Sequence, residues 1–167
     1  IFPDRDEDFH LEVANRYRAI YDTMAIEICP PFPHMKPLLR NLKDAGVVVT
    51  IASSKRSNLV QVVIDHHDLN DYFAMVVGAQ EVTHHKPHPE SVHITVAKLD
   101  IPHEHTIVIG DSTFDLDMAR NAGVDAIGVT TGVHTKEMLE RSDPTHIVED
   151  LVAVEKIILN GKNGKSV

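Results

Sequence analysis

The sequence has little cysteine, few aromatic residues and no long apolar run. Its single cysteine, Cys29, cannot form an internal disulfide, which favours a reducing compartment. Tryptophan is absent and aromatic residues make up 5% of the chain, so we expect no stacking platform for bases or sugars. No apolar run approaches transmembrane length. These absences together predict a cytoplasmic protein that does not enter a membrane.

Positive charge is also scarce. The chain has 16 Lys and Arg residues against 25 Asp and Glu, a formal net charge of −9. This balance argues against nucleic acid and anionic lipid as partners. The 167 residues, 43% of them apolar and 25% charged, are typical of one soluble domain with a real core.

Apolar, β-branched runs alternate with segments of helical spacing. Since the apolar runs show no polar alternation, we expect an α/β fold, a parallel sheet with helices on both faces. The expected strands are 47–52, 74–78, 106–109, 126–130 and 146–148, and the expected helices are 9–24, 35–45, 58–67, 89–99, 112–122, 136–141 and 151–159.

Two carboxylates stand at the end of one expected strand. Residues 106–109 predict a short buried strand, Asp111 follows it, and Asp115 lies one helical turn further on. Open α/β sheets bind ligands at this carboxyl edge, and two carboxylates at a helix start can offer oxygen ligands to Mg²⁺. The alternative is that Asp111 only caps the helix.

Polar side chains follow two further strands. Ser53 and Ser54 precede a helix, where a hydroxyl and free backbone N–H groups can cradle a phosphate. Lys86 lies in a loop stiffened by Pro87, which would hold its charge near a phosphoryl group. The alternatives are an ordinary serine turn and a solvated surface lysine.

This order of hydroxyl, ammonium and carboxylate pair resembles the phosphatase branch of the haloacid dehalogenase superfamily. Residues 51–55, 86–90 and 110–115 are similar to its second, third and fourth motifs. Residues 117–123 and 128–132 resemble the corresponding runs of the phosphoglycolate phosphatase and pyrophosphatase group. The resemblance covers roughly residues 9–159 and implies a Rossmann-like α/β core.

The resemblance also implies roles. Ser53, Ser54 and Lys86 would bind the phosphoryl group, with Ser53, Lys86 and Asp111 catalytic. Asp111 and Asp115 would hold Mg²⁺ as cofactor. The implied activity is Mg²⁺-dependent hydrolysis of a small phosphate ester through an aspartyl-phosphate.

One motif of the family has no good match. Its enzymes carry an Asp-x-Asp nucleophile motif on the first strand, and Asp4-Arg5-Asp6 follows only three residues, one of them a proline. We therefore expect the nucleophile upstream of Ile1, and its strand to be missing from between the Ser53 and Asp111 strands; a second chain could also supply that strand. On this alignment residues 1–28 are a remnant of a helical cap with its linker, 29–160 the core and 161–167 a flexible tail.

Three alternatives to the phosphatase stay open from the sequence. A sugar phosphomutase of the same superfamily would share nearly all the core residues. Without the nucleophile, the chain could instead be a non-catalytic fragment or a phosphate-binding module.

Histidine is abundant, with twelve residues. Four of them, His84, His85, His88 and His93, are clustered. A zinc site is one interpretation, and surface histidines are the default one, because prolines 87 and 89 keep His84 and His88 off one regular helix.

Overall fold

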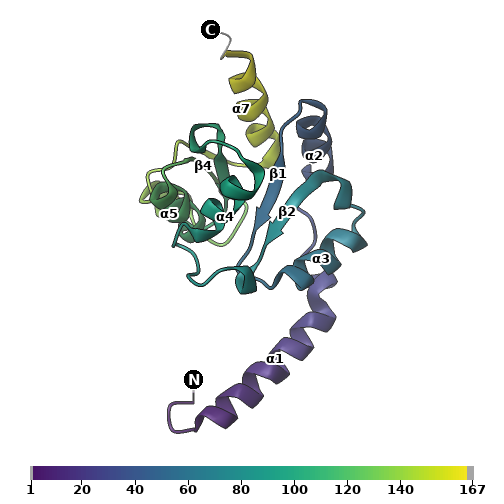
Figure 1. The fold of residues 1–167 in the computed structure, drawn as a ribbon, viewed down its shortest axis with the longest axis vertical. Coiled ribbons are helices and arrows are strands. Elements are labelled where there is room, and N and C mark those ends of the chain that lie inside the picture. Colours follow the sequence, from purple (N-terminus) through teal and green to yellow (C-terminus); the bar gives the residue numbers. More distant parts are fainter. Residues whose placement is uncertain (1, 165–167) are drawn as a thin grey trace.

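The computed structural model describes residues 2–164, and their side chains as far as residue 161. Strands and helices alternate along the chain (Figure 1), as the sequence predicts, with bounds within a few residues of those expected for most elements. The helices are α1 (Glu7–Ile28), α2 (Met35–Asp44), α3 (Ser57–His66), α4 (Glu90–Leu99), α5 (Thr113–Ala122), α6 (Lys136–Glu140) and α7 (Leu151–Gly164). The strands are β1 (Val49–Ala52), β2 (Phe73–Val77), β3 (Ile107–Gly110), β4 (Asp125–Val129) and β5 (His146–Val148). Three short 3₁₀ helices, η1 (Asn70–Tyr72), η2 (Ala79–Glu81) and η3 (His103–His105), were not predicted.

The C-terminal helix is longer than expected. α7 continues to Gly164, so residues 161–164, predicted as flexible tail, are helical; residues 165–167 lie outside the described part. None of the helices within residues 2–164 is long and apolar enough to cross a membrane.

All strand pairs are parallel, which confirms the predicted α/β class. β1 pairs with β2, and β3, β4 and β5 pair in that order, so the strands form two sheets rather than one. In the part of the chain that the structure describes, β1 and β3 each keep one edge that pairs with no strand.

A cavity of about 220 Å³ is lined by both of these strands. Thr50 of β1 and Ile107, Val108 and Ile109 of β3 contribute to its wall. Ile109, predicted to be buried in its strand, is 39% exposed because it faces this space. Lys86 and Asp115 also border the cavity, so it reaches the carboxyl edge of the sheets.

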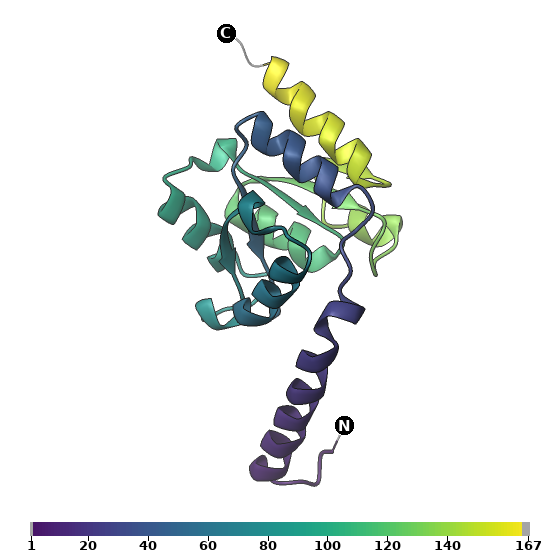
Figure 2. The ribbon, with the colours of Figure 1, turned by 90° about the vertical axis from the view of Figure 1, so that its right-hand side faces the viewer.

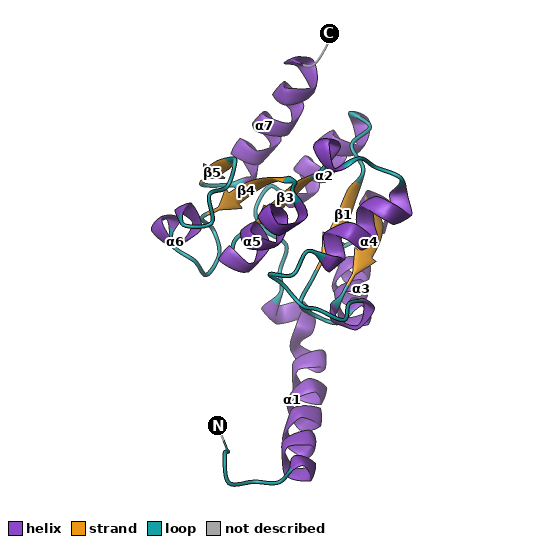
Figure 3. Ribbon diagram, turned by 60° about the vertical axis from the view of Figure 1, so that its left-hand side comes forward, coloured by secondary structure: helices purple, strands orange, loops and turns teal. Residues whose placement is uncertain are grey.

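Helices cover both faces of the three-stranded sheet. Successive side chains of β4 point to opposite faces, so Ile127 packs with α2 and α7 while Ala126 packs with α5 and α6. Figure 2 shows α2 and α7 side by side, and Figure 3 shows α5 and α6 beside β3 and β4. The core therefore holds β4 at its centre.

Helix α1 projects away from this body (Figures 1 and 2). Of its residues only Ala25 is buried, and the apolar Tyr17 and Ile20 are 62% and 56% exposed. An ion pair between Asp22 and Arg56, just before α3, joins its C-terminal half to the core. Over most of its length, the helix therefore leaves large apolar side chains exposed.

Candidate active site

Lys86 links the carboxyl ends of the two sheets. Its Nζ atom donates to the carbonyl oxygen of Ala52, the last residue of β1, at 2.9 Å. The same atom donates to Oδ1 of Asp115, in the first turn of α5, at 2.6 Å. The side chains of Lys86 and Asp115 are only 14% and 13% exposed, so solvent screens this pair weakly.

The second oxygen of Asp115 is also engaged. Oδ2 accepts a 2.5 Å hydrogen bond from the hydroxyl of Ser112, which is the N-cap residue of α5. A Cβ atom on Gly110 would lie 2.3 Å from that of Asp115, so only glycine at position 110 allows this approach. Asp115 is therefore held by two hydrogen-bond donors, Lys86 and Ser112, in the space that Gly110 leaves open.

Asp111 has a different environment. Ser112, not Asp111, caps α5, so the interpretation of Asp111 as the helix cap is wrong. Within the described residues, no donor hydrogen-bonds the half-buried carboxylate of Asp111. A Cβ atom on Gly132 would lie 1.8 Å from Oδ2 of Asp111, so the loop after β4 approaches it closely. An unpartnered carboxylate beside a helix N-terminus has the hard donor chemistry that suits Mg²⁺.

Ser53 and Ser54 lie at the end of β1, close to Lys86. The backbone N–H of Ser53 donates to the carbonyl of Val77 at 2.8 Å, and its hydroxyl accepts from the N–H of Lys55 at 3.1 Å. Ser53 therefore forms the serine turn that was the alternative interpretation. With Ser54 and Lys86 it also lines one small cavity.

The predicted residues thus gather at one edge of the sheets, but they do not all touch one another. Lys86 touches Asp115 and lines the small cavity with Ser53 and Ser54, while Asp111 comes directly after β3 at the same edge. No contact joins Asp111 to Ser53 among the residues described here.

The structure adds residues that the motifs did not indicate. Ser112 caps α5 and holds Asp115, and His134 accepts from the N–H of Thr113 at 2.9 Å. Ser112 precedes Asp115 by three residues, a capping pattern visible in the sequence. The contacts of His134 and Gly132 join distant parts of the chain, so no local pattern predicts them.

Hydrogen bonds from two helices hold the loop that contains Lys86. Both carboxylate oxygens of Glu90 accept backbone N–H groups, those of Thr83 and His84, each at 2.8 Å. These hydrogen bonds lower the pKa of Glu90 to about 2. On the other side, Asn121 of α5 donates to the carbonyl of Pro87 at 2.9 Å. The position of Lys86 is thus set by α4 and α5 together.

Asp4 and Asp6 lie far from this edge. Asp6 is the N-cap of α1, where its carboxylate accepts from the N–H of Phe9 at 2.9 Å. Because α1 projects from the body, its N-terminal end lies away from the two sheets (Figure 2). The Asp4-Arg5-Asp6 run is therefore part of a helix start and does not join the gathered residues.

Gly78 is expected to be essential for the stability of the turn that carries Ser53 and Ser54. A Cβ atom there would lie 2.3 Å from the backbone nitrogen of Ser57 and 2.7 Å from the carbonyl oxygen of Lys55. Both contacting atoms belong to the backbone, which cannot move aside as a flexible side chain can. Gly78→Ala should therefore lower the free energy of unfolding by at least about 1–3 kcal/mol, measured by urea denaturation. Gly161→Ala is the control, since its Cβ meets nothing within 4 Å. Equal stability of the two variants would contradict this account of the turn.

Comparison with known proteins identifies the family of this chain. The sequence model of the family described as "Haloacid dehalogenase-like hydrolase" matches residues 3–129. "Probable phosphatase IndB" of Dickeya dadantii is 36% identical over 146 residues, which cover 86% of this chain. A phosphoglycolate phosphatase of Salmonella typhi is 29% identical over 152 residues, 88% of this chain. The chain spans 64% and 60% of the lengths of these two relatives.

A solved structure shows the same arrangement of elements. The crystal structure of the "Putative haloacid dehalogenase-like hydrolase" from Bacteroides fragilis superposes with a TM-score of 0.84 at 30% identity, covering 90% of this chain and 71% of that one. With the family match over residues 3–129, this confirms the resemblance predicted from the motifs, and the chain belongs to the haloacid dehalogenase-like hydrolase family.

Proposed function

We propose that this chain provides most of the catalytic core of a Mg²⁺-dependent phosphatase that acts on a small phosphate ester through an aspartyl-phosphate. The observation that carries the proposal is the pairing of Lys86 with Asp115 at the same sheet edge as Asp111, whose carboxylate accepts no hydrogen bond from the described residues. A fixed cation next to a free carboxylate suits an anionic substrate that arrives with a divalent ion.

The nucleophile is proposed to lie on a strand outside residues 1–167 that occupies the cavity between β1 and β3. Each of these strands has one edge that pairs with no strand of the described residues 2–164, and the cavity extends from their side chains to Lys86 and Asp115. A parallel strand placed there would pair with both edges, and its carboxyl end would emerge beside Lys86. An aspartate at that end would be positioned for attack on phosphorus.

The residues of this chain would then have separate roles in the proposed reaction. The aspartate oxygen bonds to phosphorus as the bond to the ester oxygen breaks, and the departing oxygen takes a proton from the second aspartate of the same Asp-x-Asp motif. Lys86 offsets negative charge on the transferring group, while the hydroxyl of Ser53 and the N–H of Ser54 orient it. Mg²⁺ held by Asp111, with Asp115 as the second carboxylate, would offset the remaining charge. Water then releases phosphate and restores the aspartate.

Substrate choice is proposed to rest on the segment around α1. The relative from Salmonella typhi is named a phosphoglycolate phosphatase, which supports a small phosphorylated metabolite as substrate. We assign residues 1–28 to a remnant of a helical cap and its linker, because α1 carries apolar side chains that the core leaves exposed. Residues 29–160 would form the core proper.

Hydrolysis of p-nitrophenyl phosphate by the full-length protein tests the proposal. We expect turnover with Mg²⁺ and its loss in EDTA, restored by excess Mg²⁺. Turnover that ignores EDTA would contradict a metal-dependent phosphatase. Binding of phosphate in the presence of Mg²⁺, measured by calorimetry without any turnover, would identify a phosphate-binding module instead.

A further inference from the structure

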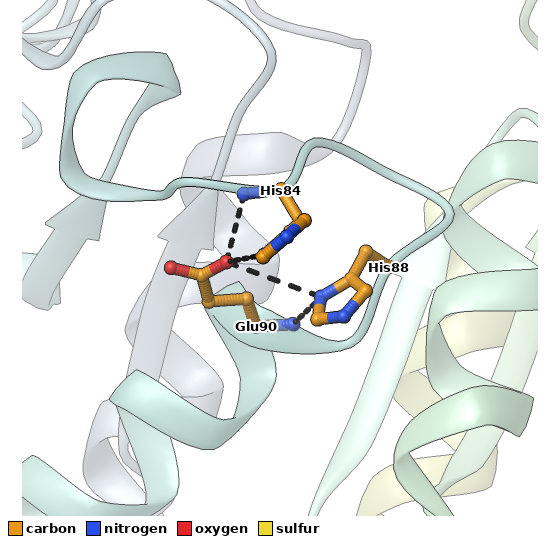
Figure 4. Close-up of side chains that lie close together, drawn as sticks. All are labelled: His84, His88 and Glu90. Atoms are coloured by element: carbon orange, nitrogen blue, oxygen red, sulfur yellow. Dashed lines mark hydrogen bonds and ion pairs between the residues drawn. The ribbon is translucent and has the colours of Figure 1, made fainter.

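Three side chains with metal-binding chemistry converge on the loop before α4 (Figure 4). They belong to His84, His88 and Glu90, and one ligand atom from each lies within 4.8 Å of the other two. Nδ1 of His84 lies 2.9 Å from Oε2 of Glu90, and Nδ1 of His88 lies 4.0 Å from the same oxygen. The sequence pattern grouped His84 and His88 with His85 and His93 but did not include Glu90.

These separations are close to what a metal ion requires. With metal–ligand distances of about 2.0–2.2 Å in a tetrahedral site, neighbouring ligand atoms lie about 3.3–3.6 Å apart. The distances of 2.9 and 4.0 Å to Oε2 of Glu90 bracket that value. Small rotations of the exposed histidine side chains would therefore equalise them.

The three groups are already held near one another. Glu90 is fixed by the backbone N–H groups of Thr83 and His84, each of which donates to one of its carboxylate oxygens. The rings of His84 and His88 stack with their centroids 4.4 Å apart. Ligands that are ordered in advance lose less entropy when they bind.

Little has to be broken for an ion to enter. Nδ1 of His88 accepts only a long contact of 3.3 Å from the backbone N–H of Glu90. The contact between His84 and Glu90 is lost, but the metal bond replaces it. The side chains of His84 and His88 are 62% and 47% exposed, so the ion could reach the site and keep a water ligand.

We propose that His84, His88 and Glu90 bind one divalent ion of the zinc class, Zn²⁺, Co²⁺ or Ni²⁺. Two imidazoles and one carboxylate favour these ions over Mg²⁺, which prefers oxygen ligands and near-octahedral geometry. The site is separate from the carboxylates at Asp111 and Asp115, and its existence does not depend on the proposed reaction. Because His84 and His88 flank Lys86 in sequence, the bound ion cross-links the two sides of that loop.

Calorimetric titration of the full-length protein with ZnCl₂ in excess Mg²⁺ tests the site. The Mg²⁺ keeps the hard carboxylate site occupied, so the remaining high-affinity binding reports the histidines. We expect one Zn²⁺ per chain, with the dissociation constant raised at least about 10-fold in His84→Asn and in His88→Asn, a loss seen even when partners behind metal ligands are removed.

His85→Asn is the matched control, because His85 is an exposed residue of the same loop outside the three-residue cluster. It should keep the wild-type dissociation constant, and so should Asp111→Asn. The proposal would be overturned by any of three results. These are a Zn²⁺ dissociation constant raised as much in His85→Asn as in His84→Asn, an unchanged dissociation constant in His84→Asn, or no saturable Zn²⁺ binding by the wild type. Zn²⁺ should also raise the unfolding temperature of the wild type but not of the His84→Asn protein, a readout that shows whether the variant is folded.

Discussion

Asp111→Asn in the full-length protein is expected to reduce phosphatase kcat by about 10³-fold, the scale of losing one major electrostatic group of a reacting site. The substitution keeps the size of the side chain and removes its charge. Because no donor in the described residues bonds this carboxylate, the fold should not suffer, and the unfolding temperature should stay the same or rise. Steady-state kinetics with p-nitrophenyl phosphate and a thermal melt measure the two effects.

Gly132→Ala provides a second approach to the same carboxylate. The added methyl group would fall 1.8 Å from Oδ2 of Asp111, so either that side chain or the loop must move. We expect the Mg²⁺ concentration for half-maximal activity to rise in the Gly132→Ala variant.

The Asp111→Asn result can also contradict the proposal. If this variant keeps more than a tenth of the wild-type kcat, another group must hold the metal.

Lys86→Met is expected to reduce both activity and stability. The loss of kcat should be about 10²–10³-fold, because the fixed cation at the phosphoryl position is gone. Stability should fall by up to about 3 kcal/mol, the low end for breaking a buried ion pair, since Asp115 is left with an uncompensated charge at 13% exposure. Urea denaturation measures the second effect.

Lys86→Arg separates the two losses. Arginine keeps the charge but replaces a compact ammonium with a planar fork, whose longer reach and fixed donor directions differ from those of the Nζ atom that bonds Ala52 and Asp115. We therefore expect stability to recover in part while kcat stays low. Full recovery of activity in Lys86→Arg would show that charge alone, without position, is sufficient.

Much of the fold follows from local patterns in the sequence. Uniform apolar strands and helical spacing predicted the alternation of elements, and they placed Ser53 and Asp111 after strands and Asp115 one helical turn beyond Asp111. The position of Asp111 outside the helix could also have been predicted, since Ser112 and Asp115 form a capping pattern. These features depend on neighbours within one or two turns.

The rest depends on contacts between distant residues. The bond from Lys86 to Ala52 joins residues 34 positions apart, and that from Thr113 to His134 joins residues 21 apart. The close approach of Gly132 to Asp111 is of the same kind. The convergence of Glu90 with His84 and His88 required the exact path of a loop that contains two prolines. Periodicity contains no information on such contacts.

The cavity between β1 and β3 also determines how strongly the site's charges interact. Lys86 and Asp115 both border it, so its contents are part of their dielectric surroundings. Two unit charges 4 Å apart attract by about 1 kcal/mol in bulk water but by about 4 kcal/mol at an effective dielectric constant of 20. Water in the cavity therefore weakens the pair, and a peptide strand in its place strengthens it. The content of the space between the sheets therefore determines how strongly Lys86 attracts an anionic substrate.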